Sequence, residues 1–260
     1  QKCNEGRGIV SPRLVVGIPS GVTGVERRAV REAGMAGARE VHLIDEPVAA
    51  AIGASLPVTE PIGTMIVDIG GGTTEVAVLS LGGTVLSESV RVAGDEINDS
   101  IGTYLKKVHN LVVGERTAEE IKIRIGSAFP DNQFDLQSMD VRGLHLLSGL
   151  PRSINLQAGE LREAMSEPLN KIVEAVKRTL ERTPPELAAD IVDRGIMLAG
   201  GGALVRGISD LVSHETGIFT HVAEDPLLCV VNGCGQVLED FKRLRRVLDT
   251  PEFVRSQVKD

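Results

Sequence analysis

Asp68 is followed by three glycines and a threonine, and apolar residues flank this group on both sides. The stretch reads Met65-Ile-Val-Asp-Ile-Gly-Gly-Gly-Thr-Thr-Glu-Val-Ala-Val-Leu-Ser-Leu81. Because glycine has no Cβ atom, Gly70, Gly71 and Gly72 let the backbone approach a ligand and point N–H groups at it. Asp68 can hold a hydrated divalent cation, and Thr73 offers a hydroxyl beside it in sequence. The spacing therefore predicts a phosphate and metal site.

Two strands are expected to hold this glycine turn. The apolar run before it is typical of a buried strand, and the residues after it also alternate as a strand. This pattern excludes a Walker loop, because no Gly-Lys-Ser/Thr follows, and a Rossmann turn, which needs a helix directly after the glycines. An ordinary turn is the alternative, and we prefer a nucleotide site because the whole strand–Asp–glycine–Thr–strand arrangement is more specific.

A second glycine triplet, Gly200 to Gly202, follows the apolar residues Ile196 to Ala199. This order predicts a buried strand, a turn and the start of a helix. Free N–H groups at a helix N-terminus favour an anion or a ribose-phosphate edge.

Two pairs of charged residues have both a structural and a chemical interpretation. Asp45 and Glu46 lie between the strand predicted at 41–44 and the helix that begins at Pro47. They could cap the helix dipole, which we prefer from these residues alone, or act on a water or a metal. Glu119 and Lys122 lie three positions apart on a predicted helix, where they indicate an exposed ion pair.

The remaining elements are predicted from capping patterns and periodicity. Thr23 with Glu26, and Thr117 with Glu120, match the capping box that opens a helix. Residues 127–157 are expected to form a small peripheral sheet with a turn at Arg142-Gly143. Leu156 to Glu181 shows the apolar spacing of a long amphipathic helix.

The composition excludes several classes of function. The 260 residues carry a net charge of −8, and only 2% are aromatic, which argues against a nucleic-acid surface. The acidic charge also argues against binding anionic lipid by charge alone. Three scattered cysteines cannot form a disulfide framework, and the five histidines show no metal-ligand spacing. No apolar run is long enough to span a bilayer, and no signal peptide is visible.

Several motifs together carry a resemblance to known proteins. They are Val25-Glu-Arg-Arg-Ala, Glu46-Pro-Val-Ala-Ala-Ala-Ile-Gly-Ala, Asp68-Ile-Gly-Gly-Gly-Thr-Thr-Glu-Val-Ala-Val, Gly114-Glu-Arg-Thr-Ala-Glu-Glu-Ile-Lys122, Thr183-Pro-Pro-Glu-Leu and Leu198-Ala-Gly-Gly-Gly-Ala. With these motifs the chain resembles the actin, Hsp70 and sugar-kinase ATPase superfamily, and within it the bacterial actins of the MreB/Mbl family. This resemblance implies an α/β, actin-like ATPase (ribonuclease H-like) fold with mixed sheets flanked by helices.

The resemblance also implies roles for single residues toward ATP or ADP and Mg²⁺. Asp68 would hold Mg²⁺ through water, and Glu46 would position the attacking water with Thr73 beside it. The residues implied to bind nucleotide are Gly70, Gly71, Gly72 and Thr73 at the phosphates, and Glu119, Lys122, Gly200, Gly201, Gly202 and Ala203 around the ribose and adenine.

The family's biology supplies further expectations. Its members polymerise with ATP into filaments on the inner face of the cytoplasmic membrane and control rod cell shape. The implied partners are further copies of the chain, inner-membrane cell-shape and cell-wall synthesis proteins and the membrane surface, but no nucleic acid. Ile9 and Val10 lie where the family has an apolar membrane-touching loop.

Two differences from the family pattern are visible. Asp45 replaces a glutamate, and the family's first phosphate loop, an Asp-x-Gly-Thr hairpin, is not found. We therefore expect an incomplete first domain and little or no ATP hydrolysis by this chain alone. The expected subdomains are IA (residues 1–60 and 230–260), IIA (61–100 and 191–229) and IIB (101–190). The alternatives are another ATPase of the superfamily, such as a small-molecule kinase or a chaperone, and a non-hydrolysing nucleotide-binding scaffold.

Overall fold

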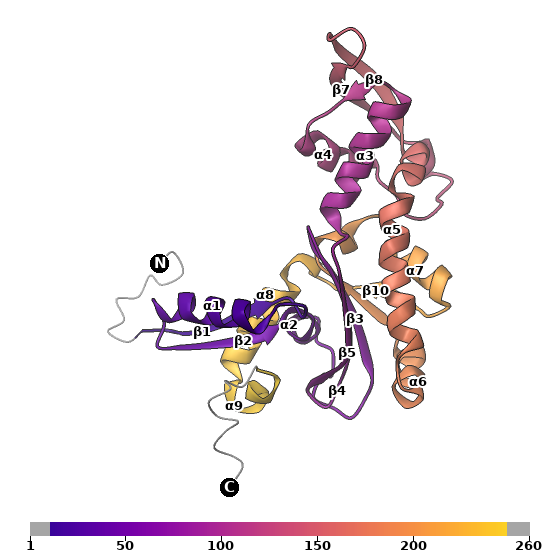
Figure 1. Cartoon of the computed structure of the whole chain (residues 1–260). Helices are drawn as coiled ribbons and strands as arrows, with labels where there is room; N and C mark the ends of the chain where they lie inside the picture. Colours follow the sequence, from indigo (N-terminus) through magenta and orange to yellow (C-terminus); the bar gives the residue numbers. More distant parts are fainter. Residues whose placement is uncertain (1–10, 249–260) are drawn as a thin grey trace.

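The computed structural model describes residues 11–248, which form three sheets and the helices packed on them (Figure 1). The strands are β1 (Arg13–Ile18), β2 (Glu40–Asp45), β3 (Thr64–Ile69), β4 (Thr74–Ser80), β5 (Gly83–Val90), β6 (Leu111–Val112), β7 (Ser138–His145), β8 (Pro151–Gln157), β9 (Ile196–Ala199) and β10 (Thr220–Val222). The α-helices are α1 (Gly24–Met35), α2 (Glu46–Gly53), α3 (Gly94–Val108), α4 (Glu115–Ile125), α5 (Ala158–Glu181), α6 (Pro185–Arg194), α7 (Ile208–Thr216), α8 (Cys229–Glu239) and α9 (Phe241–Leu244). Single-turn 3₁₀ helices are η1 (Phe134–Leu136), η2 (Gly201–Leu204), η3 (Pro226–Leu228) and η4 (Arg245–Val247).

The first sheet contains β1 and β2, which pair in parallel and are connected by α1. Thr23 begins this helix as its N-cap: its hydroxyl accepts from the Glu26 N–H, and the Glu26 carboxylate accepts from the Thr23 N–H. The predicted capping box is confirmed here. β2 then leads directly into α2, so Glu46 stands at the first position of that helix.

The second sheet has five strands in the order β10-β9-β3-β4-β5. β3 pairs with β9 in parallel and with β4 antiparallel, so the sheet is mixed, as expected. One face of β3 and β4, with Ile66 and Ala77, packs into a core with α2 and α8. The other face, with Val67 and Val76, packs into a core with α3 and α5. Both faces are covered because each strand reads as an almost continuous apolar run.

Helices α2 and α8 lie between the β1–β2 pair and the five-stranded sheet (Figure 1). At the far end of the molecule, α3 and α4 pack with the three-stranded sheet β6-β7-β8. The long helix α5 extends from that end back along the five-stranded sheet. The predicted peripheral sheet within 127–157 and the long amphipathic helix are both confirmed.

Two local predictions are wrong. Helix α4 begins at Glu115 after the N-cap Gly114, so Thr117 lies inside its first turn and does not cap it. Arg142-Gly143 is not a turn, because β7 continues through it in register with β8, and the chain reverses after His145. A Cβ on Gly143 would lie 2.5 Å from the Val112 carbonyl oxygen, so this glycine permits close strand packing.

The second glycine triplet is only partly as predicted. It does follow the buried strand β9, but it opens the single-turn 3₁₀ helix η2, and the next α-helix begins only at Ile208. Gly200 has a φ of +81°, which an L-residue rarely adopts, so the chain turns sharply before any helix can form.

Candidate functional site

A cavity of about 650 Å³ brings the two glycine turns together. Its lining residues are Glu46, Asp68, Gly70, Gly71, Gly94, Asp95, Glu119, Lys122, Ile123, Gly200, Gly201, Gly202, Leu204, Val205, Pro226, Leu227 and Val230. Nine of the predicted site residues are therefore gathered around one space. Gly72, Thr73 and Ala203 belong to the same turns but do not line this cavity, so their contacts with a ligand stay predictions.

Strand pairing explains why turns so far apart in sequence meet. β3 and β9 are parallel neighbours with Asp68 opposite Ala199, so both turns leave the same edge of the sheet. Gly200 lies directly against the end of β3: an added Cβ would be 2.3 Å from the Ile69 carbonyl oxygen and 2.5 Å from a carboxylate oxygen of Asp68. Only glycine fits where the second turn passes the first.

The N-terminus of α3 holds the first glycine turn. The Gly94 N–H donates to the Gly70 carbonyl at 3.1 Å, and the Asp95 N–H donates to the Gly71 carbonyl at 2.8 Å. The turn also closes on itself, because the Gly70 N–H donates to the Thr73 carbonyl at 2.9 Å. Within residues 11–248, the N–H groups of Gly71 and Gly72 have no protein acceptor. They form a fixed pair of donors that suits an anion such as a phosphate.

Three carboxylates cluster at the cavity: Asp68 and Glu46 line it, and Glu75 lies behind Asp68 in the sheet. Asp68 is only 8% exposed, and Glu75 lies opposite it across the β3–β4 pair. Burial, together with the negative charges of Glu46 and Glu75, raises the pKa of Asp68 to about 7. Burial, with the charge of Glu75, also raises the pKa of Glu46. A bound cation would offset this excess of negative charge.

The donor set fits Mg²⁺ held through water. In the described part of the chain, no group of three or more His, Cys, Asp or Glu side chains could enclose a metal ion. Mg²⁺ keeps several of its waters and commonly binds one or two carboxylates together with the phosphates of a nucleotide. Asp68, at the end of β3 beside the free N–H groups, is placed for that mode of binding.

On the opposite wall, Lys122 does not form the predicted exposed ion pair with Glu119. Its Nζ donates to the Gly94 carbonyl at 3.0 Å, and no ion pair between the two residues occurs in the described structure. Burial lowers the pKa of Lys122, while the charges of Glu119 and Asp95 raise it. Lys122 therefore connects α4 to the helix end that holds the first glycine turn.

Asp45 and Glu46 take different roles. The Asp45 side chain makes no capping hydrogen bond to α2 and instead forms a 2.9 Å ion pair with Arg27. Glu46 lines the cavity, with its Cγ 3.3 Å from the place of an added Cβ on Gly17. The helix-capping interpretation is thus not what the geometry favours for Glu46, which faces the same space as Asp68.

Sequence reasoning missed several cavity residues. Asp95 was not singled out from the sequence, yet its carboxylate would lie 3.5 Å from a Cβ on Gly71. Glu75, which does not line the cavity but lies opposite Asp68 across the β3–β4 pair, was not singled out either. The exposed apolar side chains Ile123, Leu204 and Leu227 form a wall that suits a flat ring. Of these residues, only Asp95 could have been found from the sequence, because it is an acidic residue at the predicted start of a helix.

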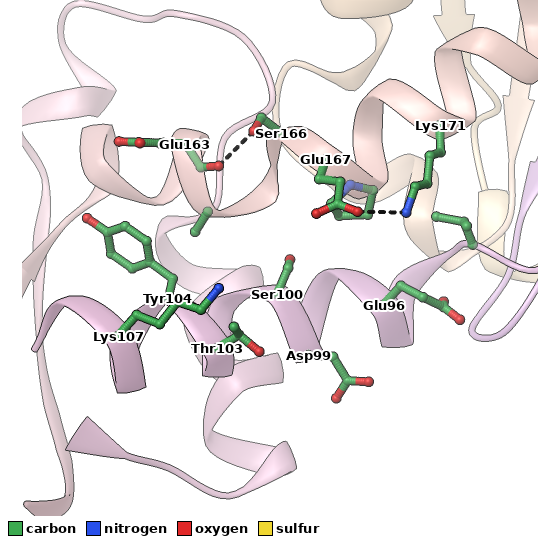
Figure 2. A pocket seen from close by; sticks show the side chains of 13 residues that line it. Glu96, Asp99, Ser100, Thr103, Tyr104, Lys107, Glu163, Ser166, Glu167 and Lys171 are labelled. Atoms are coloured by element: carbon green, nitrogen blue, oxygen red, sulfur yellow. Dashed lines mark hydrogen bonds and ion pairs between the residues drawn. The ribbon is translucent and has the colours of Figure 1, made fainter. Parts of the chain in front are cut away.

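A second cavity of about 530 Å³ lies between α3 and α5 (Figure 2). Its walls carry mostly charged and hydroxyl side chains, and Glu167 there pairs with Lys171 at 2.8 Å. It contains no glycine among its lining residues and so offers no bare N–H cradle. The first cavity is the better candidate for a nucleotide.

The predicted membrane-contact residues Ile9 and Val10 lie outside the described residues. Within residues 11–248, no helix combines the length and the apolar character needed to cross a bilayer.

Known proteins resemble this chain over most of its length. The family profile "MreB/Mbl protein" matches residues 1–246. The cell shape-determining protein MreB of Escherichia coli K12 is 54% identical over 230 residues, which are 88% of this chain and 66% of that protein. The cell shape-determining protein Mbl of Bacillus subtilis 168 is 44% identical over 240 residues, 92% of this chain and 72% of that protein. The chain thus spans about two thirds of the length of the MreB sequences that it matches.

Solved structures agree with this assignment. MreB5 of Spiroplasma citri bound to ADP superposes with a TM-score of 0.86 at 37% identity, covering 90% of this chain and 71% of that one. The filament protein MamK, at 20% identity and a TM-score of 0.77, supports the fold alone. The expected actin-like ATPase fold is confirmed, and the chain belongs to the MreB/Mbl family.

Proposed function

We propose that the cavity binds ATP or ADP together with Mg²⁺. The observation that carries this proposal is the meeting of two glycine turns at one edge of the sheet, with unpaired N–H groups on one side and an apolar wall on the other. Structures of Spiroplasma citri MreB5 bound to ADP and to AMPPNP support the choice of ligand.

The phosphates would lie on the first glycine turn. The N–H groups of Gly71 and Gly72 donate to phosphate oxygens, and the Thr73 hydroxyl supplies a further polar contact. Asp68 holds Mg²⁺ through water, and the ion neutralises charge on the phosphate oxygens when it is bound. The clustered carboxylates Asp68, Glu46 and Glu75 explain why a cation belongs there.

The nucleoside would lie between the second glycine turn and α4. Gly200, Gly201 and Gly202 line the cavity from one turn, and Glu119 and Lys122 line it from α4. We place the ribose and adenine between these two sets, with Ala203 next to the glycines. Leu227 packs close to Gly201, where an added Cβ would be 3.0 Å from its side chain, so a larger residue at position 201 would crowd Leu227.

We still expect little or no hydrolysis by this chain alone, and for any hydrolysis we assign Glu46 the orientation of the attacking water, with Thr73 beside it. Its raised pKa is consistent with a carboxyl group that can accept a proton from water. In-line attack on the terminal phosphate needs the water on the side of the phosphate away from the leaving group. Glu46 lines the same cavity as the first glycine turn, and we therefore assign it to a water beside the terminal phosphate.

At the level of the cell, we propose an ATP-dependent filament protein that controls rod shape. Its partners would be further copies of the chain, inner-membrane cell-shape and cell-wall synthesis proteins and the inner face of the cytoplasmic membrane. Its MreB and Mbl relatives are named cell shape-determining proteins, which supports this role. We retain the predicted subdomains: IA for 1–60 and 230–260, IIA for 61–100 and 191–229, and IIB for 101–190.

Nucleotide binding is tested by calorimetric titration of the chain with Mg-ADP. Gly71→Val should weaken binding at least about tenfold, because its branched side chain occupies the place of a phosphate oxygen. An added Cβ at Gly71 meets nothing closer than 3.5 Å, so this variant should fold. Gly83→Val, in the next hairpin, is the control and should bind as the unaltered chain does. Absence of Mg-ADP binding by the unaltered chain would overturn the proposal.

Filament formation has a separate test. The protein should sediment when ATP is added, and electron microscopy of the pellet should show filaments. The Gly71→Val variant should not sediment in response to ATP. Nucleotide binding without sedimentation at any concentration tested would favour a nucleotide-binding scaffold.

A further inference from the structure

Glu75 is a fully buried carboxylate that the function proposed above does not use directly. It is the second residue of β4 and is only 1% exposed. Its Oε2 accepts a hydrogen bond from the Ser20 N–H at 3.2 Å, and its Oε1 accepts one from the Ser89 hydroxyl at 2.5 Å. One carboxylate therefore links the five-stranded sheet to the turn that follows β1.

The register of the five-stranded sheet shows where Glu75 points. Asp68, Glu75 and Ser89 are direct neighbours across β3, β4 and β5, so their side chains share one face of the sheet. Further along the strands, Ile66 and Ala77 belong to that same face, which packs on α2 and α8. Asp68, Glu75 and Ser89 therefore lie on the sheet face that packs on α2 and α8, and Asp68 at one end of this row lines the cavity.

Ser20 lies on the other side of this contact, in the turn that follows β1. The turn is closed by a hydrogen bond from the Val22 N–H to the Pro19 carbonyl at 3.3 Å. Gly21, the next residue, sits against Ser89, which an added Cβ would approach to 3.7 Å. The turn at 19–22 therefore rests on the end of β5, with Glu75 beneath it.

Burial of this carboxylate needs an explanation, because an ionised group loses its hydration when it is buried. Within residues 11–248, Glu75 forms no ion pair, and its carboxylate accepts hydrogen bonds from the Ser20 N–H and the Ser89 hydroxyl. An apolar side chain in the same place would avoid this desolvation penalty. The carboxylate is therefore suited to a positional role that an apolar side chain could not perform.

We propose that Glu75 is a positioning residue that fixes the 19–22 turn, and with it the side of the cleft that carries Glu46, against the phosphate-binding sheet. The link runs from Glu75 to Ser20, back along β1 to its parallel partner β2, and from β2 directly into α2. This inference rests on the proposed nucleotide site only for its functional consequence, which is that fixing the two walls in place prepares the cavity for Mg-nucleotide.

The sharpest test removes the donor N–H and leaves the rest of the turn. Ser20 is the second residue of the four-residue turn and does not have a positive φ, so proline is acceptable there. Ser20→Pro lacks the N–H that Glu75 binds, whereas Ser20→Ala keeps it. Both variants lose the hydroxyl, which is buried and has no hydrogen-bond partner, so Ser20→Ala is a matched control.

Two measurements decide the outcome. In the ligand-free chain, amide hydrogen exchange at residues 21–22 should be roughly tenfold faster in Ser20→Pro than in Ser20→Ala, because a hydrogen bond to a charged group is lost. Mg-ADP should bind roughly tenfold more weakly to Ser20→Pro, while Ser20→Ala binds like the unaltered chain. Equal exchange and equal affinity in the two variants would overturn the inference.

Variants of the carboxylate test the same link from the other side. Glu75→Gln keeps an acceptor oxygen and should retain protection of the 19–22 turn, whereas Glu75→Ala should lose it. Ser89→Ala removes only the hydrogen bond within the sheet and should leave the turn protected. If Glu75→Ala does not fold, the Ser20 pair still gives a decision. If the unaltered chain does not bind Mg-ADP, the proposed function fails, but the exchange comparison continues to test the positional role.

Discussion

The two walls of the cleft are held in place by different means. Asp68 and the first glycine turn follow β3, a strand buried along its whole length and paired on both sides. Glu46 follows β2, which pairs with β1, and the helix that connects those two strands buries none of its residues. The wall with Asp68 and the first glycine turn, here called the phosphate wall, is fixed by a sheet. The wall with Glu46, here called the Glu46 wall, needs a different support.

Besides the proposed Glu75–Ser20 link, the Glu46 wall is supported by the contact between α2 and α8. Residues 47–52 of α2 are all buried, and its last residue, Gly53, meets the backbone of α8. An added Cβ on Gly53 would be 1.9 Å from the Cys229 carbonyl oxygen, and one on Gly233 would be 1.9 Å from the Ala49 carbonyl oxygen. The comparison shows that a wall with few strands can be positioned by two helix backbones in direct contact.

The largest effect is therefore expected at Gly233. Gly233→Ala places a methyl group far inside the van der Waals contact distance of a backbone oxygen, so α8 must move away from α2. We expect a loss of about 4 kcal/mol in the free energy of unfolding, or failure to fold. Chemical denaturation of the purified chain measures this loss.

Gly235 provides the control on the same helix. An added Cβ there meets nothing within 4 Å. Gly235→Ala should stabilise the chain by up to about 1 kcal/mol, because alanine is the better helix former. If both variants were equally stable, the helix contact would not be what fixes the Glu46 wall.

The next effect concerns the phosphate wall and depends on pH. The pKa of Asp68 is raised to about 7 from a model-compound value of 3.8, so the native state keeps a proton that the unfolded chain releases. The free energy of unfolding should therefore fall as pH rises from about 4 to about 7 and then level off. Asp68→Asn lacks this group and should be more stable than the unaltered chain at pH 8, by on the order of 3 kcal/mol.

Denaturation of the ligand-free chain at pH 5, 6, 7 and 8 provides the measurement. Asp68→Asn should show a flatter dependence on pH, whereas Asp99→Asn, at an exposed position of α3, should follow the unaltered chain. Mg-ADP should restore stability at pH 8 only when Asp68 is present. A pH dependence that is the same in all three proteins would show that the buried carboxylates do not set the properties of this wall.

The sheet side of the comparison was largely predictable from sequence. β3 and β4 are apolar runs on either side of the glycines, so both strands could be predicted. Helix α5 could be predicted from its apolar periodicity and α1 from its capping box. Gly143 was misread because a glycine inside a strand looks like a turn until the neighbouring Val112 backbone is known. The contact between Gly53 and Gly233 joins residues that are 180 positions apart, and no local pattern reveals it.

The site, like the fold, was predictable only in part. Asp68 and the glycine turns carry their chemistry in a short stretch, so their types and spacing were sufficient. Glu75 becomes informative only when β4 is paired with β3 and the Ser20 turn lies above it. Lys122 looked like half of an exposed ion pair because its acceptor, the Gly94 carbonyl, lies on another helix.

The smallest expected effect compares one sequence pattern in the two halves of the molecule. Thr23 and Thr117 are each followed three residues later by glutamate, but only Thr23 caps a helix. Thr23→Ala should lower the free energy of unfolding by about 1 kcal/mol, because the Glu26 N–H loses its acceptor. Thr117→Ala should change it by less than about 0.5 kcal/mol or raise it slightly, since alanine favours a helix interior. Denaturation of both variants under one condition separates these values, and an equal loss at both positions would mean that Thr117 supports the start of α4 after all.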